Sequence, residues 1–141
     1  MTAAGIIFSN FHDRDLTELT RVRTMASIPF ACRYRLVDFP LSNMVNAGIS
    51  DILVITHYNY LSLMNHIGSG KDWDLARRSG GVTILPPYIT AYASRANSLY
   101  STRLEALKGG RHSIGELCED YVVLSDCGSG ANLELAQMLR A

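Results

Sequence analysis

Four short apolar runs, spaced along the chain, are the feature that most constrains how it can fold. They cover residues 5–9, 51–56, 82–85 and 121–125 and are rich in β-branched side chains, which predicts four strands. The runs are apolar throughout rather than alternating, and this is typical of strands covered on both faces. The sequence therefore predicts an α/β protein with a mostly parallel sheet.

Segments with helical spacing lie between these runs. They cover residues 39–47, 58–67 and 99–108, and each is followed at once by a glycine of the kind that often ends a helix. A further helix is expected at 133–140. Strands that alternate with helices favour right-handed βαβ units, so we expect a doubly wound sheet with helices on both faces.

Composition limits the classes of function. The 141 residues suit one globular unit, and thirteen basic and thirteen acidic residues cancel, so no overall field favours nucleic acid or an anionic membrane. The three cysteines, Cys32, Cys118 and Cys127, show no CxxC spacing, which argues against a disulfide framework or a zinc site. Without a leader pattern or an apolar stretch of about 18 residues, a cytoplasmic protein is expected.

Two long stretches, 11–30 and 86–98, show no regular pattern and are expected to be irregular. Loops of that length in an α/β domain are more often functional than not. Ligands of open parallel sheets collect at the carboxyl ends of the strands. This rule places residues 9–14, 57–60, 86–88 and 126–130 along one candidate edge.

Four segments carry a family resemblance: SIPFACRYRLVDFPLSNMVNAGI at 27–49, HYNYLSLMNHIGSGKDWDL at 57–75, GGVTILPPY at 80–88 and DYVVLSD at 120–126. The chain resembles the sugar nucleotidyltransferases, and among them the bacterial glucose-1-phosphate adenylyltransferases, with the regulatory D-type subunits most similar. The resemblance implies a Rossmann-like nucleotidyltransferase sheet. It also implies that residues 1–141 form the N-terminal part of that domain, with the rest of the domain and a β-helix domain absent.

The family reaction joins ATP and glucose 1-phosphate into ADP-glucose and pyrophosphate with Mg²⁺, in glycogen synthesis. Family members hold the triphosphate with a glycine-rich loop, an arginine and a lysine. Leu19, Thr20 and Arg23 match the pattern, but the lysine position falls on Met25. Loop glycines are replaced, so we expect a degenerate triphosphate loop made of Ser9, Asn10, Phe11, His12, Asp13, Arg14, Arg23 and Met25.

Asp126 follows the last predicted strand and matches the family aspartate that helps bind the metal. The alternative is a turn aspartate that accepts hydrogen bonds from nearby amides. The sequence also differs from the family pattern nearby, since Ser101, Thr102 and Arg103 stand where the family has arginine, glycine and threonine. Mg²⁺ is therefore expected through the resemblance alone.

Four further residues are candidates for an effector site or a subunit interface: Arg33, Arg35, Lys71 and Trp73. The two arginines alternate with Tyr34 and Leu36, which also fits an extended segment with two different faces. Trp73 could equally pack a loop onto the core. His57 and His66 are nine residues apart and do not have the spacing of a metal-binding pair on one helix.

Three hypotheses for function follow. The first is a regulatory subunit with weak or no activity of its own, in a hetero-oligomer with a catalytic glucose-1-phosphate adenylyltransferase subunit. The second is an active pyrophosphorylase with an unusual triphosphate loop, and the third is a non-enzymatic α/β module that senses nucleotides. ATP or a sugar phosphate is the candidate ligand, and neither nucleic acid nor a membrane is an expected partner.

Overall fold

The computed structural model describes residues 2–10, 14–76, 80–86 and 102–140. Phe11, His12 and Asp13 of the predicted loop lie outside these residues, as do most of the stretch 86–98 and the start of the helix predicted at 99. The elements, in chain order, are β1 (Ala3–Phe8), α1 (Thr17–Thr20), η1 (Met25–Ser27), β2 (Pro29–Phe30), β3 (Tyr34–Arg35), α2 (Asp38–Asn46), β4 (Asp51–Ile55), α3 (Leu61–Ile67), η2 (Lys71–Trp73), β5 (Gly81–Leu85), α4 (Arg103–Gly109), α5 (Arg111–Gly115), β6 (Tyr121–Asp126) and α6 (Leu135–Arg140).

The four predicted strands form one sheet in the order β5-β4-β1-β6. All three pairings are parallel, and β1 in the centre aligns Ile7 with Val54 of β4 and Phe8 with Asp126 of β6. The apolar runs become strands because both faces of the central pair are buried. The expected α/β fold with a parallel sheet is confirmed.

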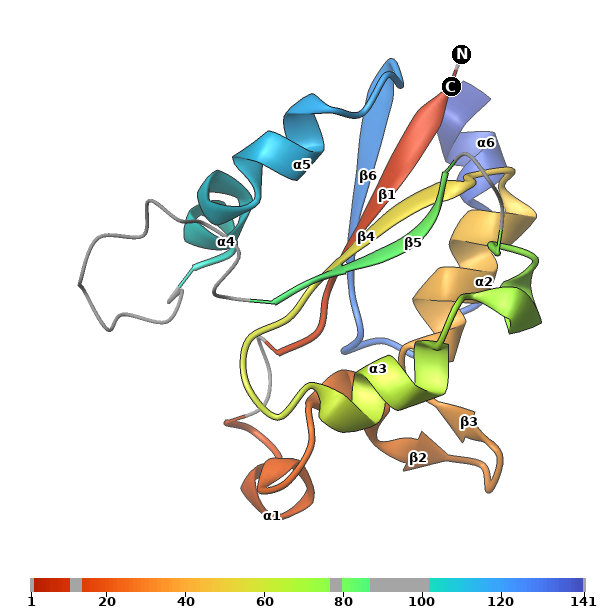
Figure 1. Ribbon diagram of the computed structural model, residues 1–141. Helices are drawn as coiled ribbons and strands as arrows, with labels where there is room; N and C mark the ends of the chain where they lie inside the picture. The colour runs from red at the N-terminus through yellow and green to blue at the C-terminus, as the bar shows by residue number, and fades with distance from the viewer. Residues whose placement is uncertain (1, 11–13, 77–79, 87–101, 141) are drawn as a thin grey trace.

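Helices cover both faces of this sheet, as a doubly wound fold requires (Figure 1). On one face Ile7 and Val54 pack with Leu41, Met44 and other residues of α2, α3 and α6. On the other face Ile6, Phe8 and Leu85 pack against Ala106 of α4. Neighbouring residues of β1 therefore serve opposite layers, which follows from the two-residue repeat of a strand.

The helices begin within a few residues of the predicted starts, and one of them has a side-chain cap. Helix α2 begins at Asp38, one residue before the expected start, and α3 begins at Leu61 rather than at 58. Helix α4 begins at Arg103, directly after Thr102, whose hydroxyl accepts a hydrogen bond from the Glu105 amide while the Glu105 carboxylate accepts one from the Thr102 amide. This capping box fixes the position of the first turn.

The stretch expected to be irregular at 11–30 contains the short elements α1 and η1 and leads into a hairpin made of β2 and β3. Helix α5 was not predicted either. Strands of two residues show no period in the sequence, so the hairpin has no pattern to reveal it. Among the described residues no helix is long and apolar enough to cross a membrane.

Candidate functional site at the carboxyl edge of the sheet

The chain leaves the end of β1 and then returns to it. The Ser9 amide donates to the Ile55 carbonyl at 3.1 Å and so extends the ladder with β4. The Ala26 amide in turn donates to the Ser9 carbonyl at 3.4 Å. Met25, which the family resemblance assigned to the position of a lysine, thus lies directly before a residue bonded to Ser9. The two ends of the predicted loop meet there, and the side chain of Met25 is an uncharged thioether.

Asn10, which belongs to the predicted degenerate loop, joins two strand ends through its side chain. Its Oδ1 accepts hydrogen bonds from the His57 amide at 2.8 Å and from the Ser9 hydroxyl at 2.6 Å. Its Nδ2 donates to the Tyr58 carbonyl at 3.2 Å. The Asn10 side chain therefore lies between the carboxyl ends of β1 and β4. Its partners there include one backbone amide and one backbone carbonyl.

His57 lies at the end of β4, with its ring 5.0 Å from the ring of Tyr58, centroid to centroid. Burial lowers the pKa of His57, and the positive charge of Arg14 lowers it further. Both effects disfavour a proton on the imidazole. His57 is therefore a neutral group at pH 7 and adds no positive charge for a phosphate.

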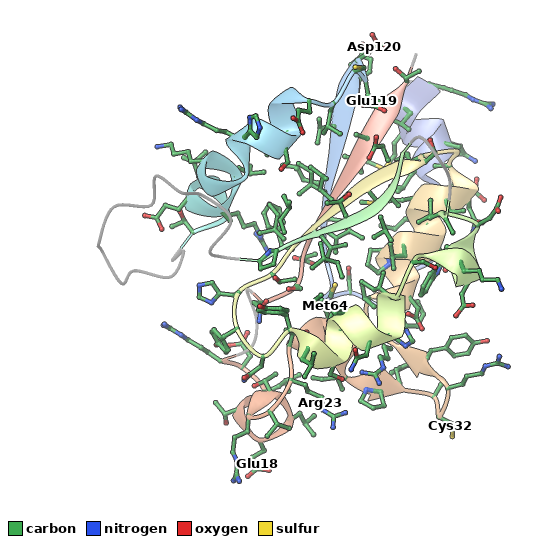
Figure 2. All side chains as sticks on the ribbon, in the orientation of Figure 1. Glu18, Arg23, Cys32, Met64, Glu119 and Asp120 are labelled. Carbon is green, nitrogen blue, oxygen red and sulfur yellow. The ribbon has the colours of Figure 1, made fainter. Side chains whose placement is uncertain are left out.

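The segment with α1 is held to the loop after β4. Asn59 Nδ2 donates to the carbonyls of Thr20 at 3.4 Å and Arg21 at 3.3 Å, and the buried Thr20 hydroxyl donates to the Leu16 carbonyl. Thr20 thus has a structural role. Arg14 is exposed and Arg23 half-buried, and Figure 2 shows Glu18 at the outer side of α1, pointing away from the sheet.

Asp126 ends β6 and already has partners for both oxygens. Its Oδ2 accepts a hydrogen bond from the Arg103 guanidinium at 2.8 Å, and its Oδ1 accepts one from the Gly128 amide at 3.1 Å. Sequence reasoning noted Arg103 only as a departure from the family pattern. The signal that could have placed it was the spacing of Thr102 and Glu105, which predicts a helix start at 103.

The side chains at this edge do not provide enough ligands for a metal ion by themselves. Within the described residues no group of three or more histidine, cysteine, aspartate or glutamate side chains could hold a metal ion. Mg²⁺ needs several oxygen ligands in octahedral geometry, and usually takes one or two carboxylates together with substrate phosphates. Asp126 offers one carboxylate, and both of its oxygens already accept hydrogen bonds, one of them from a cation.

Two of the candidate effector or interface residues, Arg35 and Trp73, are joined in one chain of contacts. The Arg35 guanidinium donates to the Ser27 carbonyl at 3.0 Å and to the Ser62 hydroxyl at 2.6 Å. Asp38 accepts from the Arg35 amide at 2.9 Å and contacts His66 Nε2 at 2.6 Å. The His66 ring then meets the Trp73 ring edge-on at 6.0 Å. This network connects β3, α2, α3 and η2.

Arg33 and Lys71, by contrast, are exposed. Trp73 packs partly buried against the core, as the alternative interpretation had it. The pairing of Asp38 with His66 was not predicted, since 28 residues separate the two and no local pattern links them. Effector binding by these residues stays a prediction.

Comparison with known proteins gives a consistent picture. The nucleotidyl transferase family profile matches residues 12–128. A glucose-1-phosphate adenylyltransferase of Halalkalibacterium halodurans is 39% identical over 120 residues, which is 85% of this chain and 30% of that protein. The glycogen biosynthesis protein GlgD of Bacillus subtilis is 48% identical over 82 residues, 58% of this chain and 24% of that protein. The chain thus spans less than a third of the length of these relatives.

Among solved structures, one from Bacillus anthracis assigned as a glucose-1-phosphate thymidylyltransferase, in complex with sucrose, matches with a TM-score of 0.71. The match covers 99% of this chain and 49% of that one, at 16% sequence identity. At this level of identity the likeness concerns the fold.

Proposed function

Because this chain belongs to the nucleotidyl transferase family, we propose that it acts as part of a regulatory subunit of glucose-1-phosphate adenylyltransferase, with little or no turnover of its own. The reaction it would regulate makes ADP-glucose and pyrophosphate from ATP and glucose 1-phosphate in glycogen synthesis. The names of its relatives, adenylyltransferases and the glycogen biosynthesis protein GlgD, support the choice of pathway.

The state of the carboxyl end of β1 is the observation that carries the proposal. A phosphate loop works by presenting successive backbone amides to the phosphates, and glycines permit that approach. Here the Asn10 side chain lies at the end of β1, where a phosphate loop would begin, and it forms hydrogen bonds with the backbone of His57 and Tyr58. The end of β1 is therefore built to join two strands, which leaves it poorly suited to hold a triphosphate.

Charge supports the same proposal. Transfer of a nucleotidyl group relies on positioning and on neutralising phosphate charge. Met25 supplies no cation, and the neutral His57 supplies none either. Loss of one lysine contact in a partly dry site removes about 2–4 kcal/mol of transition-state stabilisation, roughly a 30- to 1,000-fold loss in rate.

The proposed partner is a catalytic glucose-1-phosphate adenylyltransferase subunit in a hetero-oligomer, and Mg²⁺ would act at that subunit's site. The exposed charges of Arg33, next to the β2–β3 hairpin, and of Lys71 in η2 are candidate contacts for the partner or for an effector phosphate. The network from Arg35 to Trp73 connects the β2–β3 hairpin with η2, so the positions of these two segments depend on the same contacts.

A turnover assay tests the proposal. ADP-glucose formation is measured for this chain alone, for a catalytic subunit alone and for the mixture. We expect background activity for the chain alone, and a mixture whose kcat or response to sugar-phosphate effectors differs from that of the catalytic subunit. Equal specific activity for the chain alone and in the mixture would reject the regulatory role and favour an active enzyme. ATP binding with no effect on the partner would favour a nucleotide-sensing module.

A further inference from the structure

We propose that Arg103 takes the place of a divalent cation at Asp126, so that this edge of the sheet is neutralised by the chain itself. The family resemblance implies Mg²⁺, yet the part of the chain that the structure describes holds no group of three or more potential metal ligands, and Asp126 is paired with Arg103. The inference concerns the state of one carboxylate. It holds or fails independently of whether the chain is a regulatory subunit.

The geometry of the Asp126 carboxylate is the first support. Arg103 holds Oδ2 at 2.8 Å, and the Gly128 amide holds Oδ1 at 3.1 Å. Each carboxylate oxygen keeps a lone pair, but an Mg²⁺ ion bound to it at about 2.0–2.1 Å would lie about 5 Å from the guanidinium on the same carboxylate. Binding of a metal at Asp126 would therefore bring two positive charges close together unless the guanidinium moved away.

Charge is the second support. The pair of Arg103 and Asp126 carries no net charge, whereas a lone carboxylate would attract a divalent ion. A guanidinium about 5 Å from a divalent cation weakens binding roughly tenfold, even with the dielectric constant of water. The side chains are 50% and 29% exposed, so the effect is that of a partly solvated pair.

The position of Arg103 follows from local structure. The capping box of Thr102 and Glu105 fixes the start of α4, and Arg103 is its first residue. Asp126 is set by its register opposite Phe8, in a parallel ladder that runs the full length of β1 and β6. Both partners thus come from well-defined elements.

The test is a titration of the whole chain with Mn²⁺, followed by electron paramagnetic resonance of the free ion. The variants are Arg103→Gln, which keeps a hydrogen-bond donor but not the charge, and Arg103→Ala. Arg111→Ala is the control, because it removes the same charge from the exposed surface of α5. Circular dichroism verifies that each variant keeps its fold.

We expect weak Mn²⁺ binding by the unmodified chain and in Arg111→Ala, and binding about tenfold tighter in both Arg103 variants. Addition of Asp126→Asn to Arg103→Gln should remove the gain. The proposal is overturned if neither Arg103 variant gains affinity, if Arg111→Ala gains as much, or if the gain survives Asp126→Asn. It is also overturned if the unmodified chain binds Mn²⁺ as tightly as the variants do. Turnover is not measured, so the result is separate from the test of regulation.

Discussion

Asn10 shows, at the scale of the residue, how a side chain of the predicted triphosphate loop can have a structural role. Its carboxamide accepts from one backbone amide and donates to one backbone carbonyl, both beyond the end of β4. A glycine has no side chain to bond the His57 amide and the Tyr58 carbonyl, which would then need water as a partner. The substitution that would make the loop more like the family pattern should therefore weaken the fold.

We predict that Asn10→Gly lowers the free energy of unfolding by about 1–3 kcal/mol, because it removes a partly buried hydrogen bond from the His57 amide and an exposed one to the Tyr58 carbonyl. Urea denaturation measures the change. Asn132→Gly, in an exposed position before α6, is the control and should change stability by less than about 0.5 kcal/mol. Equal effects of the two substitutions would contradict the structural role of Asn10.

His57 gives a prediction for pH. Its pKa in the folded protein is lowered, so below the unfolded value of about 6.5 the unfolded chain takes up a proton that the folded chain does not. Stability should therefore fall as the pH drops below about 6.5 toward the lowered pKa of the folded protein, and His57→Gln should flatten this part of the profile. Denaturation midpoints at several pH values decide between these outcomes.

At the scale of the element, the attachment of β5 depends on its first residue. Gly81 has φ +112°, and a Cβ there would lie 2.6 Å from the Leu75 carbonyl oxygen. Gly48, after α2, also has a positive φ of +82°, but a Cβ there would meet no atom within 4 Å. A substitution at Gly48 therefore meets strain in the backbone alone, whereas a substitution at Gly81 meets backbone strain and a steric clash.

Gly48→Ala should cost about 1 kcal/mol of stability, from the left-handed conformation alone. Gly81→Ala should cost about 3 kcal/mol, because the chain must also move away from the Leu75 carbonyl. Thermal or chemical denaturation of the two variants measures the difference. Similar losses for both would show that the contact between Leu75 and β5 is relaxed without cost.

The strands could be predicted from the sequence because each is a continuous apolar run, and the glycines at the helix ends gave the approximate limits of α2 and α3. The hairpin of β2 and β3 could not be predicted, because two-residue strands carry no period. In the candidate site, Asn10 could be placed after β1, but its bond to the His57 amide joins residues 47 apart. The pair of Arg103 and Asp126 likewise joins residues 23 apart, and it depends on how α4 packs on the sheet.

At the scale of the whole molecule, β6 is an edge strand with exposed apolar side chains. Tyr121, Val122 and Leu124 are 51%, 42% and 53% exposed, although Leu124 lies opposite the buried Ile6 of β1. Helices α4 and α5 cover Ile6 but leave this strand open. An apolar edge of this kind favours pairing with another chain.

We therefore predict that the chain self-associates as its concentration rises, and that Leu124→Lys weakens the association. Light scattering after size-exclusion chromatography measures the mass. Leu104→Lys, at a residue of α4 that is 62% exposed, is the matched control and should have a smaller effect. A monodisperse monomer at high concentration, for the unmodified chain, would count against an exposed associating edge.

The central claim is that the loop after β1 no longer holds a triphosphate. Restoring glycines at Asn10 and His12 without Met25→Lys should recover little binding, because amide approach and a neutralising cation act as a unit. The most direct measurement is calorimetric titration of the unmodified chain with ATP, with and without Mg²⁺. We predict weak binding, or none, under both conditions. Mg²⁺-dependent affinity in the low micromolar range would contradict the account and show that this edge of the sheet binds the triphosphate after all.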